Sequence, residues 1–386
     1  MSRGFNNKYL RFISQVTLAL LSLPMRWVSY LVPTDKQIWV FGNTYGYKDN
    51  PKYVYEFLLR DKDPAVRPIW ISKDKKHGNE SGILGESYYY LSLKGLLYQY
   101  RASAALLATG MNDVAAFTLG NKKIIQLWHG VPIKKLLLDS IETSPIPPQF
   151  KLLNRLFFKL LKRKLNSYSM VCAVNGHNQR CLAKAFGIPI DIVNVTGMPR
   201  HDIILSSYVS NNTASSGKKR ILYAPTWHAS MKDARNWLLQ VLSSDFMRYC
   251  DENDIAIDVS IHPLNKALAE ENMLPHGTTL LECEDINEQL KHYDLLITDY
   301  SSIAFDFAIL DRPVVFSCAE IDKYAAQRGI YEDFILLLKD QNVTGHALIE
   351  KVDGYLKGQR KAAPIYAYSE LGNARSRVIE EVKKLV

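Results

Sequence analysis

Two histidines each follow a run of apolar residues that is typical of a buried strand. His129 lies in the segment QLWHGVPIKK, between a candidate strand at 123–127 and Gly130, and His262 lies in SIHP. Reactive groups of α/β folds stand at the carboxyl ends of strands, and imidazole is suited to accept a proton near neutral pH. Gly130 permits a sharp turn or the close approach of a ligand. Considered singly, such histidines are more often structural, so the prediction of a reactive site needs further residues.

Hydroxyl and carboxylate side chains follow two other candidate strands. The segment LLITDYSSIAFD carries Asp299, Ser301 and Ser302 where a helix would begin. Free N–H groups and the helix dipole make such a start a site for an anion, although N-capping alone needs only one of these side chains. In YAPTWH, Thr226 could donate to a phosphate and Trp227 could stack on a base. With His262 as a further donor to a phosphate oxygen, the segments predict a phosphate or pyrophosphate site.

Several other classes of site have no matching pattern. The sequence holds neither a glycine-rich dinucleotide fingerprint nor a Walker loop, and it holds no HExxH or clustered Cys/His segment. We therefore expect no NAD, no P-loop chemistry, no metal site and no required cofactor, with Mg²⁺ left possible. The five cysteines form no CxxC pair and are expected to be reduced thiols. The net charge of +9 suits an acidic lipid, a nucleotide or a polyphosphate, and no nucleic-acid-binding motif accompanies it.

Alternating strands and helices must position these residues. The candidate strands are 38–41, 68–72, 87–91, 104–108, 123–127, 170–174, 192–195, 220–223, 255–261, 278–281, 294–298 and 313–317. Apolar strands separated by helical stretches predict parallel sheets covered on both faces. The Ser- and Asn-rich stretch 206–219 is typical of a linker. We therefore expect an α/β protein with two doubly wound domains, 33–205 and 220–386, that face a shared cleft, and a closing helix at 370–386.

Two segments have the pattern of helices that lie on a membrane. A helix over 151–166 would place Lys151, Arg155, Lys159 and Lys162 on one side and Leu and Phe on the other. That pattern is typical of binding to anionic lipid, and a surface helix packed on its own domain is the alternative. In the N-terminal segment 1–32, the charge-free part 12–25 falls short of the ~20 residues that a spanning helix needs. We expect an interfacial helix there, and a buried core helix explains the segment equally well.

Taken in order, the motifs resemble the CDP-glycerol glycerophosphotransferase family, the teichoic-acid primases and polymerases. The matching stretches are QLWHGVPIKKL, TGMPRHDIIL, LYAPTW, IHP, DLLITDYSSIAFDFAILDRPVVF and RGIYEDF, which lie between residues 126 and 334. The resemblance implies a GT-B architecture of two Rossmann-like domains with the active site between them. It also implies a peripheral protein at the cytoplasmic face of the bacterial membrane, which acts on a lipid-linked acceptor in teichoic-acid or capsule-type polymer synthesis.

The resemblance also implies a role for each motif residue. His129 would be the general base that deprotonates the acceptor hydroxyl, which then attacks the donor phosphorus proximal to glycerol and releases CMP. His262, Ser301 and Ser302 would hold the pyrophosphate. The residues that would shape the donor pocket are Gly130, Thr226 and Asp299. In the PRHD segment, Arg200 and Asp202 would brace the domain junction.

The chain departs from the family pattern at one position of the donor region. His228 stands where the family usually has an arginine after APTW, which leaves one permanent positive charge missing. The alternatives that remain are a CDP-ribitol transferase, a GT-B glycosyltransferase that uses a nucleotide sugar, and a non-catalytic nucleotide-binding membrane scaffold. The chain lacks the long extra region of the polymerases, which favours priming or single addition.

Overall fold

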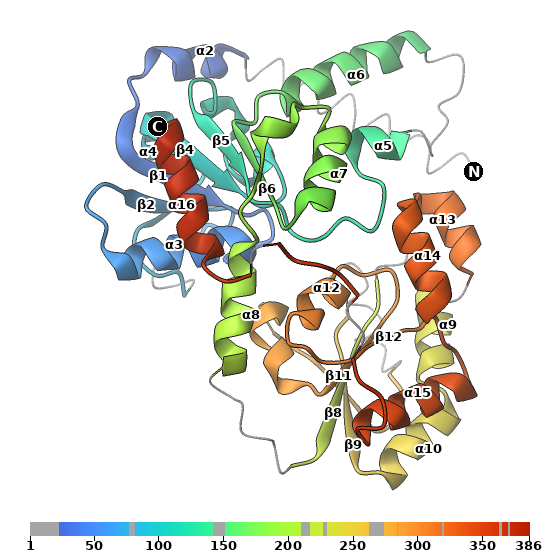
Figure 1. The fold of residues 1–386 in the computed structure, drawn as a ribbon. Coiled ribbons are helices and arrows are strands. Elements are labelled where there is room, and N and C mark those ends of the chain that lie inside the picture. Colours follow the sequence, from blue (N-terminus) through green and yellow to red (C-terminus); the bar gives the residue numbers. More distant parts are fainter. Residues whose placement is uncertain are drawn as a thin grey trace. The chain divides into compact units, whose positions relative to one another are not determined.

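Two parallel sheets, each covered by helices, make up the computed structural model of this protein (Figure 1). The structure describes residues 23–76, 82–141, 151–209, 217–226, 230–261, 274–283, 285–318, 320–362, 365–369 and 371–386. The chain divides into two compact units. The first comprises Met1–His129, Ser167–Cys172 and Arg375–Val386, and the second comprises Gly130–Asn166 and Ala173–Ala374.

The first sheet has the strand order β3-β2-β1-β4-β5-β6-β7. Its strands are β1 (Asp35–Gly42), β2 (Arg67–Ser72), β3 (Ser87–Tyr89), β4 (Ala102–Leu107), β5 (Lys123–Gln126), β6 (Met170–Ala173) and β7 (Val193–Val195). Strand β1 pairs in parallel with β2 on one side and with β4 on the other. The strand order therefore reverses between β1 and β4, and such a switch point is where open α/β sheets bind ligands.

Helices cover the first sheet because its strands are apolar on both faces. Every residue of β4 is buried, which requires cover on each side. The helices of this part of the chain are α2 (Leu23–Leu31), α3 (Asp49–Asp61), α4 (Leu93–Arg101) and α16 (Ala374–Leu385), with 3₁₀ turns at η2 (Met111–Asp113) and η3 (Ala116–Thr118). Ser92 caps the start of helix α4, because its hydroxyl accepts from the Gly95 N–H at 3.0 Å.

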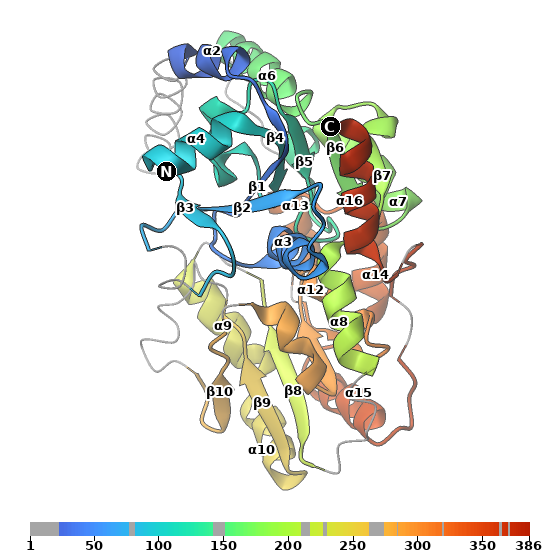
Figure 2. The ribbon, with the colours of Figure 1, turned by 90° about the vertical axis from the view of Figure 1, so that its left-hand side faces the viewer.

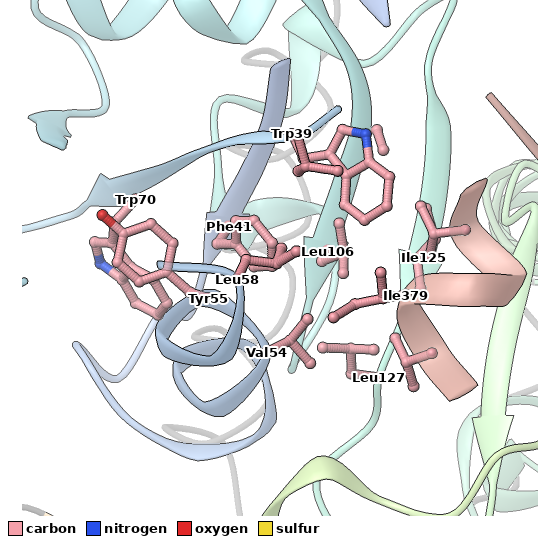
Figure 3. Close-up of a cluster of buried hydrophobic side chains, with 14 of the residues drawn as sticks. Trp39, Phe41, Val54, Tyr55, Leu58, Trp70, Leu106, Ile125, Leu127 and Ile379 are labelled. Carbon is pink, nitrogen blue, oxygen red and sulfur yellow. The ribbon is translucent and has the colours of Figure 1, made fainter. Parts of the chain in front are cut away.

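The C-terminal helix belongs to the core of the first unit, which corrects the expected domain boundary of 220–386. Val378, Ile379 and Val382 of α16 lie in the same buried cluster as Leu106 and Ile125. Figure 3 shows Ile379 directed toward the strands of this cluster, which also contains Trp39, Phe41, Val54, Tyr55, Leu58, Trp70 and Leu127. The predicted closing helix is confirmed, but it packs in the core of the first unit and not with the domain 220–386 to which it was assigned.

The second sheet repeats the same topology with five strands. Its order is β10-β9-β8-β11-β12, and all of its strand pairs are parallel. The strands are β8 (Lys219–Ala224), β9 (Ile255–Val259), β10 (Thr278–Leu280), β11 (Leu295–Thr298) and β12 (Val314–Phe316). Figure 2 shows β8, β9 and β10 side by side. The strand order reverses between β8 and β11, which gives this sheet its own switch point.

Along the chain, the helices of the second unit lie between strands of both sheets. They are α5 (Leu137–Ile141), α6 (Lys151–Leu165), α7 (Gly176–Phe186), α8 (Pro199–Val209), α9 (Met231–Val241), α10 (Ser244–Glu252), α12 (Ile303–Ala308), α13 (Ile321–Arg328), α14 (Glu332–Gln341) and α15 (His346–Leu356). Leu238 of α9, Phe246 of α10 and Val352 of α15 pack with Ile257 and Ile297 in one buried cluster. These helices and strands form a second hydrophobic core.

Eleven of the twelve predicted strands are confirmed to within two residues at each end, and β1 begins three residues earlier than predicted. The predicted linker 206–219 is too long, because α8 continues to Val209 and β8 begins at Lys219. The amphipathic helix predicted over 151–166 is α6, and α2 occupies the end of the N-terminal segment. Within the described part of the chain, no helix has both the length and the apolar character needed to cross a membrane. Residues 1–22 of that segment lie outside the described residues.

Candidate active site

His129 stands on a sharp turn after β5. Trp128 has φ +60°, and Gly130 has φ +154°, which only glycine adopts readily. The Trp128 carbonyl accepts from Asn50 Nδ2 at 2.8 Å, and the Trp128 N–H donates to Gln126 Oε1 at 3.2 Å. A bulky residue in the left-handed region is rare and persists only where its surroundings hold it. These two hydrogen bonds therefore fix the turn that presents His129.

A hydrogen bond to the backbone determines which nitrogen of His129 carries the proton. His129 Nδ1 lies 3.1 Å from the carbonyl oxygen of Ala108, the first residue after β4. Because a carbonyl oxygen only accepts, Nδ1 must donate, and in the neutral ring Nε2 then has a free lone pair. The His129 residue is exposed, and its ring lies 4.4 Å from the Trp128 ring between centroids. This arrangement suits a general base that takes a proton on Nε2.

Gly130 packs against Ser302, the second serine of the TDYSS segment. A Cβ atom built on Gly130 would lie 2.6 Å from Ser302 Oγ and 3.4 Å from Arg200 Nη2. Gly130, Ser302 and Arg200 all belong to the second unit, which begins at Gly130. The Ser302 hydroxyl makes no capping bond at the start of α12, and both Ser301 and Ser302 are half-buried. Two hydroxyl groups therefore stand at this helix start beside a residue without a side chain.

Asp299 joins the loops that follow β8 and β11, across the switch point of the second sheet. Its two carboxylate oxygens accept from the Thr226 N–H at 2.8 Å and from the Thr226 hydroxyl at 3.0 Å. Asp299 and Thr226 are 3% and 8% exposed. The Thr226 hydroxyl donates to Asp299 here, and this pair shapes the loops, while the expected contact of Thr226 with a phosphate stays a prediction. The next residue, Tyr300, is buried and stacks on Tyr324 at 3.8 Å between ring centroids.

The PRHD segment forms a buried ionic network in the second unit. Arg200 Nε and Nη2 donate to the two oxygens of Asp306 in α12 at 2.9 and 2.8 Å, and His201 Nε2 lies 3.2 Å from the same carboxylate. Burial lowers the pKa of His201, so this ring is neutral and Nε2 donates. Asp202 accepts from the Ala374 N–H at 2.9 Å. The network braces α8 against α12 and places a guanidinium group near Ser302 and Gly130.

Thr226 and Asp299 form a clamp, in which an aspartate accepts from the N–H and the hydroxyl of one threonine. A second clamp of this kind lies across the switch point of the first sheet and was not predicted from the sequence. Asp113 accepts from the Thr44 N–H at 2.9 Å and from the Thr44 hydroxyl at 2.6 Å. Thr44 follows β1, and Asp113 follows β4, just as Thr226 follows β8 and Asp299 follows β11. A threonine and an aspartate after the two strands that flank the reversal were the signal in the sequence.

Several predicted site residues lie outside the described part of the chain. They are His262, Trp227, His228 and the side chains of Lys151 and Arg155. Lys159 and Lys162 are exposed on α6. Among the described residues, no group of three or more His, Cys, Asp or Glu side chains could hold a metal ion.

Comparison with known proteins identifies the family. A family model for CDP-glycerol:poly(glycerophosphate) glycerophosphotransferases matches residues 25–382. The chain belongs to this family. The resemblance inferred from the motifs is therefore confirmed, and the protein is an enzyme of the glycerophosphotransferase class.

Two curated relatives and one solved structure describe the likeness. A teichoic acid glycerol-phosphate transferase of Staphylococcus aureus is 27% identical over 319 residues, which are 78% of this chain and 79% of the relative. A teichoic acid poly(glycerol phosphate) polymerase of Bacillus subtilis is 28% identical over 378 residues, 92% of this chain but only 49% of the relative. The structure of the wall teichoic acid polymerase TagF matches with a TM-score of 0.64 at 21% identity, covering 100% of this chain and 97% of that one. This last match confirms the expected GT-B-like fold of the glycerophosphotransferase.

Proposed function

We propose that this glycerophosphotransferase transfers glycerol phosphate from CDP-glycerol to a hydroxyl group of a lipid-linked teichoic-acid acceptor and releases CMP. The observation that carries the proposal is that His129 and Gly130, which are adjacent in the chain, each have a distinct contact. His129 has its Nε2 lone pair free for a proton, and Gly130 packs on Ser302 of the serine pair. A base next in sequence to the glycine that packs on a serine hydroxyl suits the attack of a hydroxyl group on a diphosphate.

In the proposed step, His129 Nε2 takes the proton of the acceptor hydroxyl. The oxygen attacks the phosphorus that carries glycerol, and the new P–O bond forms as the bond to the bridging oxygen breaks. CMP leaves with that electron pair, and the imidazolium then releases its proton to solvent. The His129–Ala108 hydrogen bond supports this role, because Nδ1–H stays bonded while Nε2 reacts.

The serine pair would stabilise the charge that develops on the departing CMP. The Ser301 and Ser302 hydroxyls and the start of α12 offer donors, and the Arg200 guanidinium lies nearby. His262 is expected to contribute a further donor. Arg200 is paired with Asp306, so part of its charge is neutralised, yet it provides a permanent cation.

We also propose that the protein works as a peripheral protein at the cytoplasmic face of the bacterial membrane. Helix α2 exposes Trp27, Tyr30 and Leu31 by 70%, 52% and 81%, and aromatic residues favour the membrane interface. Helix α6 exposes Leu160 beside Lys159, which fits an apolar strip with basic flanks on anionic lipid. Five cysteines without a disulfide fit a reducing compartment.

Product analysis tests the proposed reaction. The protein would be incubated with a lipid-linked disaccharide and, in separate arms, CDP-glycerol, CDP-ribitol or a nucleotide sugar. We expect CMP release and a product heavier by one or more glycerol-phosphate units in the CDP-glycerol arm. Turnover in the ribitol or sugar arm alone would replace the donor, and nucleotide binding without CMP release in any arm would support the scaffold alternative.

A further inference from the structure

The first unit contains a buried carboxylate that the proposed reaction does not yet use. Asp113 lies at the end of η2 and is completely buried. Besides the two bonds from Thr44, its oxygens accept from the N–H groups of Ala108, Thr109 and Gly110 at 2.8, 2.7 and 3.2 Å, and from the Thr109 hydroxyl. Four of these six bonds come from backbone N–H groups, which only donate, and both threonine hydroxyls can donate as well, so the arrangement suits an ionised carboxylate.

One peptide group connects this carboxylate to the presumed base. The peptide between Ala108 and Thr109 donates its N–H to Asp113 Oδ2 at 2.7 Å, and its carbonyl accepts from His129 Nδ1 at 3.1 Å. A hydrogen bond to one end of a peptide polarises it and strengthens the bond at the other end. The negative charge of Asp113 thereby makes the Ala108 carbonyl a better acceptor.

We propose that Asp113 is a positioning residue that acts on His129 through the Ala108–Thr109 peptide. It holds the carbonyl in place, and it favours the Nδ1–H tautomer and the imidazolium that forms when Nε2 takes a proton. In carboxylate–histidine pairs of other enzymes the carboxylate contacts the ring directly. Here the peptide group stands between them, and no proton passes through it. The inference rests on the proposed role of His129 as the general base.

The surroundings of Asp113 hold its carboxylate in one position. Lys73, which directly follows β2, is a charged neighbour of Asp113. Its ammonium group donates to the Val114 carbonyl at 3.2 Å and lies 3.7 Å from the Tyr90 ring centroid. Burial lowers the pKa of Lys73 to about 8. The carboxylate is thus stabilised mainly by backbone and threonine donors, which fix its position relative to the Ala108 carbonyl.

The tautomer of His129 can be measured without any substrate. Nitrogen-15 NMR of the full chain with labelled histidine would identify the His129 signals by their loss in His129→Gln. We expect the Nδ1–H tautomer in the wild-type protein. A wild-type ring with its proton on Nε2 would overturn the proposal, and it would do so even if Asp113→Asn failed to fold.

Two variants distinguish an effect of Asp113 on His129 through the Ala108–Thr109 peptide from a general loss of order around the carboxylate. Asp113→Asn should shift His129 toward the Nε2–H tautomer and lower kcat on the order of 10–100-fold with little change in the KM for CDP-glycerol. Thr44→Val removes another donor to the same carboxylate but leaves the Ala108–Thr109 peptide bonded, and it should keep the Nδ1–H tautomer. A folded Asp113→Asn protein with an unchanged tautomer and kcat would overturn the proposal, while wild-type turnover of CDP-glycerol tests the reaction separately.

Discussion

At the turn after β5, one residue needs its side chain and the next must have none. His129 is fixed by the Ala108 carbonyl, and Gly130 approaches Ser302 so closely that a methyl group would lie 2.6 Å from its hydroxyl oxygen. Trp128 has φ +60°, which is unfavourable for a bulky residue, and Gly130 has φ +154°, which only glycine adopts without strain. Such strain is retained where the surrounding bonds hold it, which agrees with a reactive role for the residue between them.

His129→Ala should abolish transfer while CDP-glycerol still binds. Loss of a general base typically lowers the rate by ~10²–10⁴-fold. CMP release would measure the rate, and calorimetric titration with CDP-glycerol would measure binding. His346→Ala, at a histidine whose side chain is 82% exposed, serves as the control and should leave both unchanged. Near-normal turnover in His129→Ala would remove the assignment of the base.

Gly130→Ala should weaken donor binding and the fold together. The added methyl group must displace Ser302 and adopt φ +154°, and overpacking of this kind costs about 1–3 kcal/mol. We expect a higher KM for CDP-glycerol and a lower melting temperature. Gly345→Ala is the matched control, because Gly345 also has positive φ but has no atom within 4 Å of a built Cβ. Equal effects of the two substitutions would show that backbone strain, and not the contact with Ser302, is responsible.

At the scale of elements, the two sheets use the same device at their switch points. Thr44 and Asp113 join the ends of β1 and β4, and Thr226 and Asp299 join the ends of β8 and β11. Each clamp brings together loops that are 69 or 73 residues apart in the chain. The clamp of the second sheet fixes the loop that carries Ser301 and Ser302. The clamp of the first sheet fixes the loop after β4, whose Ala108 carbonyl accepts from His129.

Helix α6 gives a prediction at this scale. Replacing Lys151, Arg155, Lys159 and Lys162 by Gln should weaken sedimentation with anionic liposomes, because it removes the attraction between the basic face and the lipid. Binding of the wild-type protein should itself weaken at high salt, since the Debye length falls to about 3 Å at 1 M. A variant in which Lys339, Lys357, Lys361 and Lys384 are replaced by Gln is a charge-matched control that should still bind. Equal binding by all three proteins would exclude the proposed role of α6.

At the scale of the whole molecule, the chain crosses between the two units more than once. It leaves the first unit after His129 and returns at Ser167 and again at Arg375. Helix α16 thereby completes the first core with Val378, Ile379 and Val382. The first unit therefore needs residues from the far end of the chain, and residues 33–205 alone would leave this apolar surface exposed.

Ile379→Ala should destabilise the protein by about 2–5 kcal/mol, the usual cost of emptying a buried site of this size. Denaturant unfolding would measure the loss. Glu380→Ala changes the exposed neighbour on the same helix and should stay within about 0.5 kcal/mol of the wild type. An equally small effect of Ile379→Ala would mean that α16 contributes little to the first core.

The sequence by itself determined the strands, the two parallel sheets and the motifs at their carboxyl ends. Apolar runs such as ASAALL in β4 are local signals, and a strand that is buried on both faces needs little else to be recognised. The ordered motifs also identified the family, which the match over residues 25–382 confirmed. The individual roles of the site residues stay predictions.

Only the tertiary structure decided which distant residues meet. The bond from Thr44 to Asp113, the contact of Gly130 with Ser302 and the place of α16 in the first core all join residues far apart in the chain. Periodicity reports which face of an element is apolar, but it does not report which other element covers that face. That choice depends on packing and hydrogen bonding across the whole fold, and so does the peptide that joins Asp113 to His129.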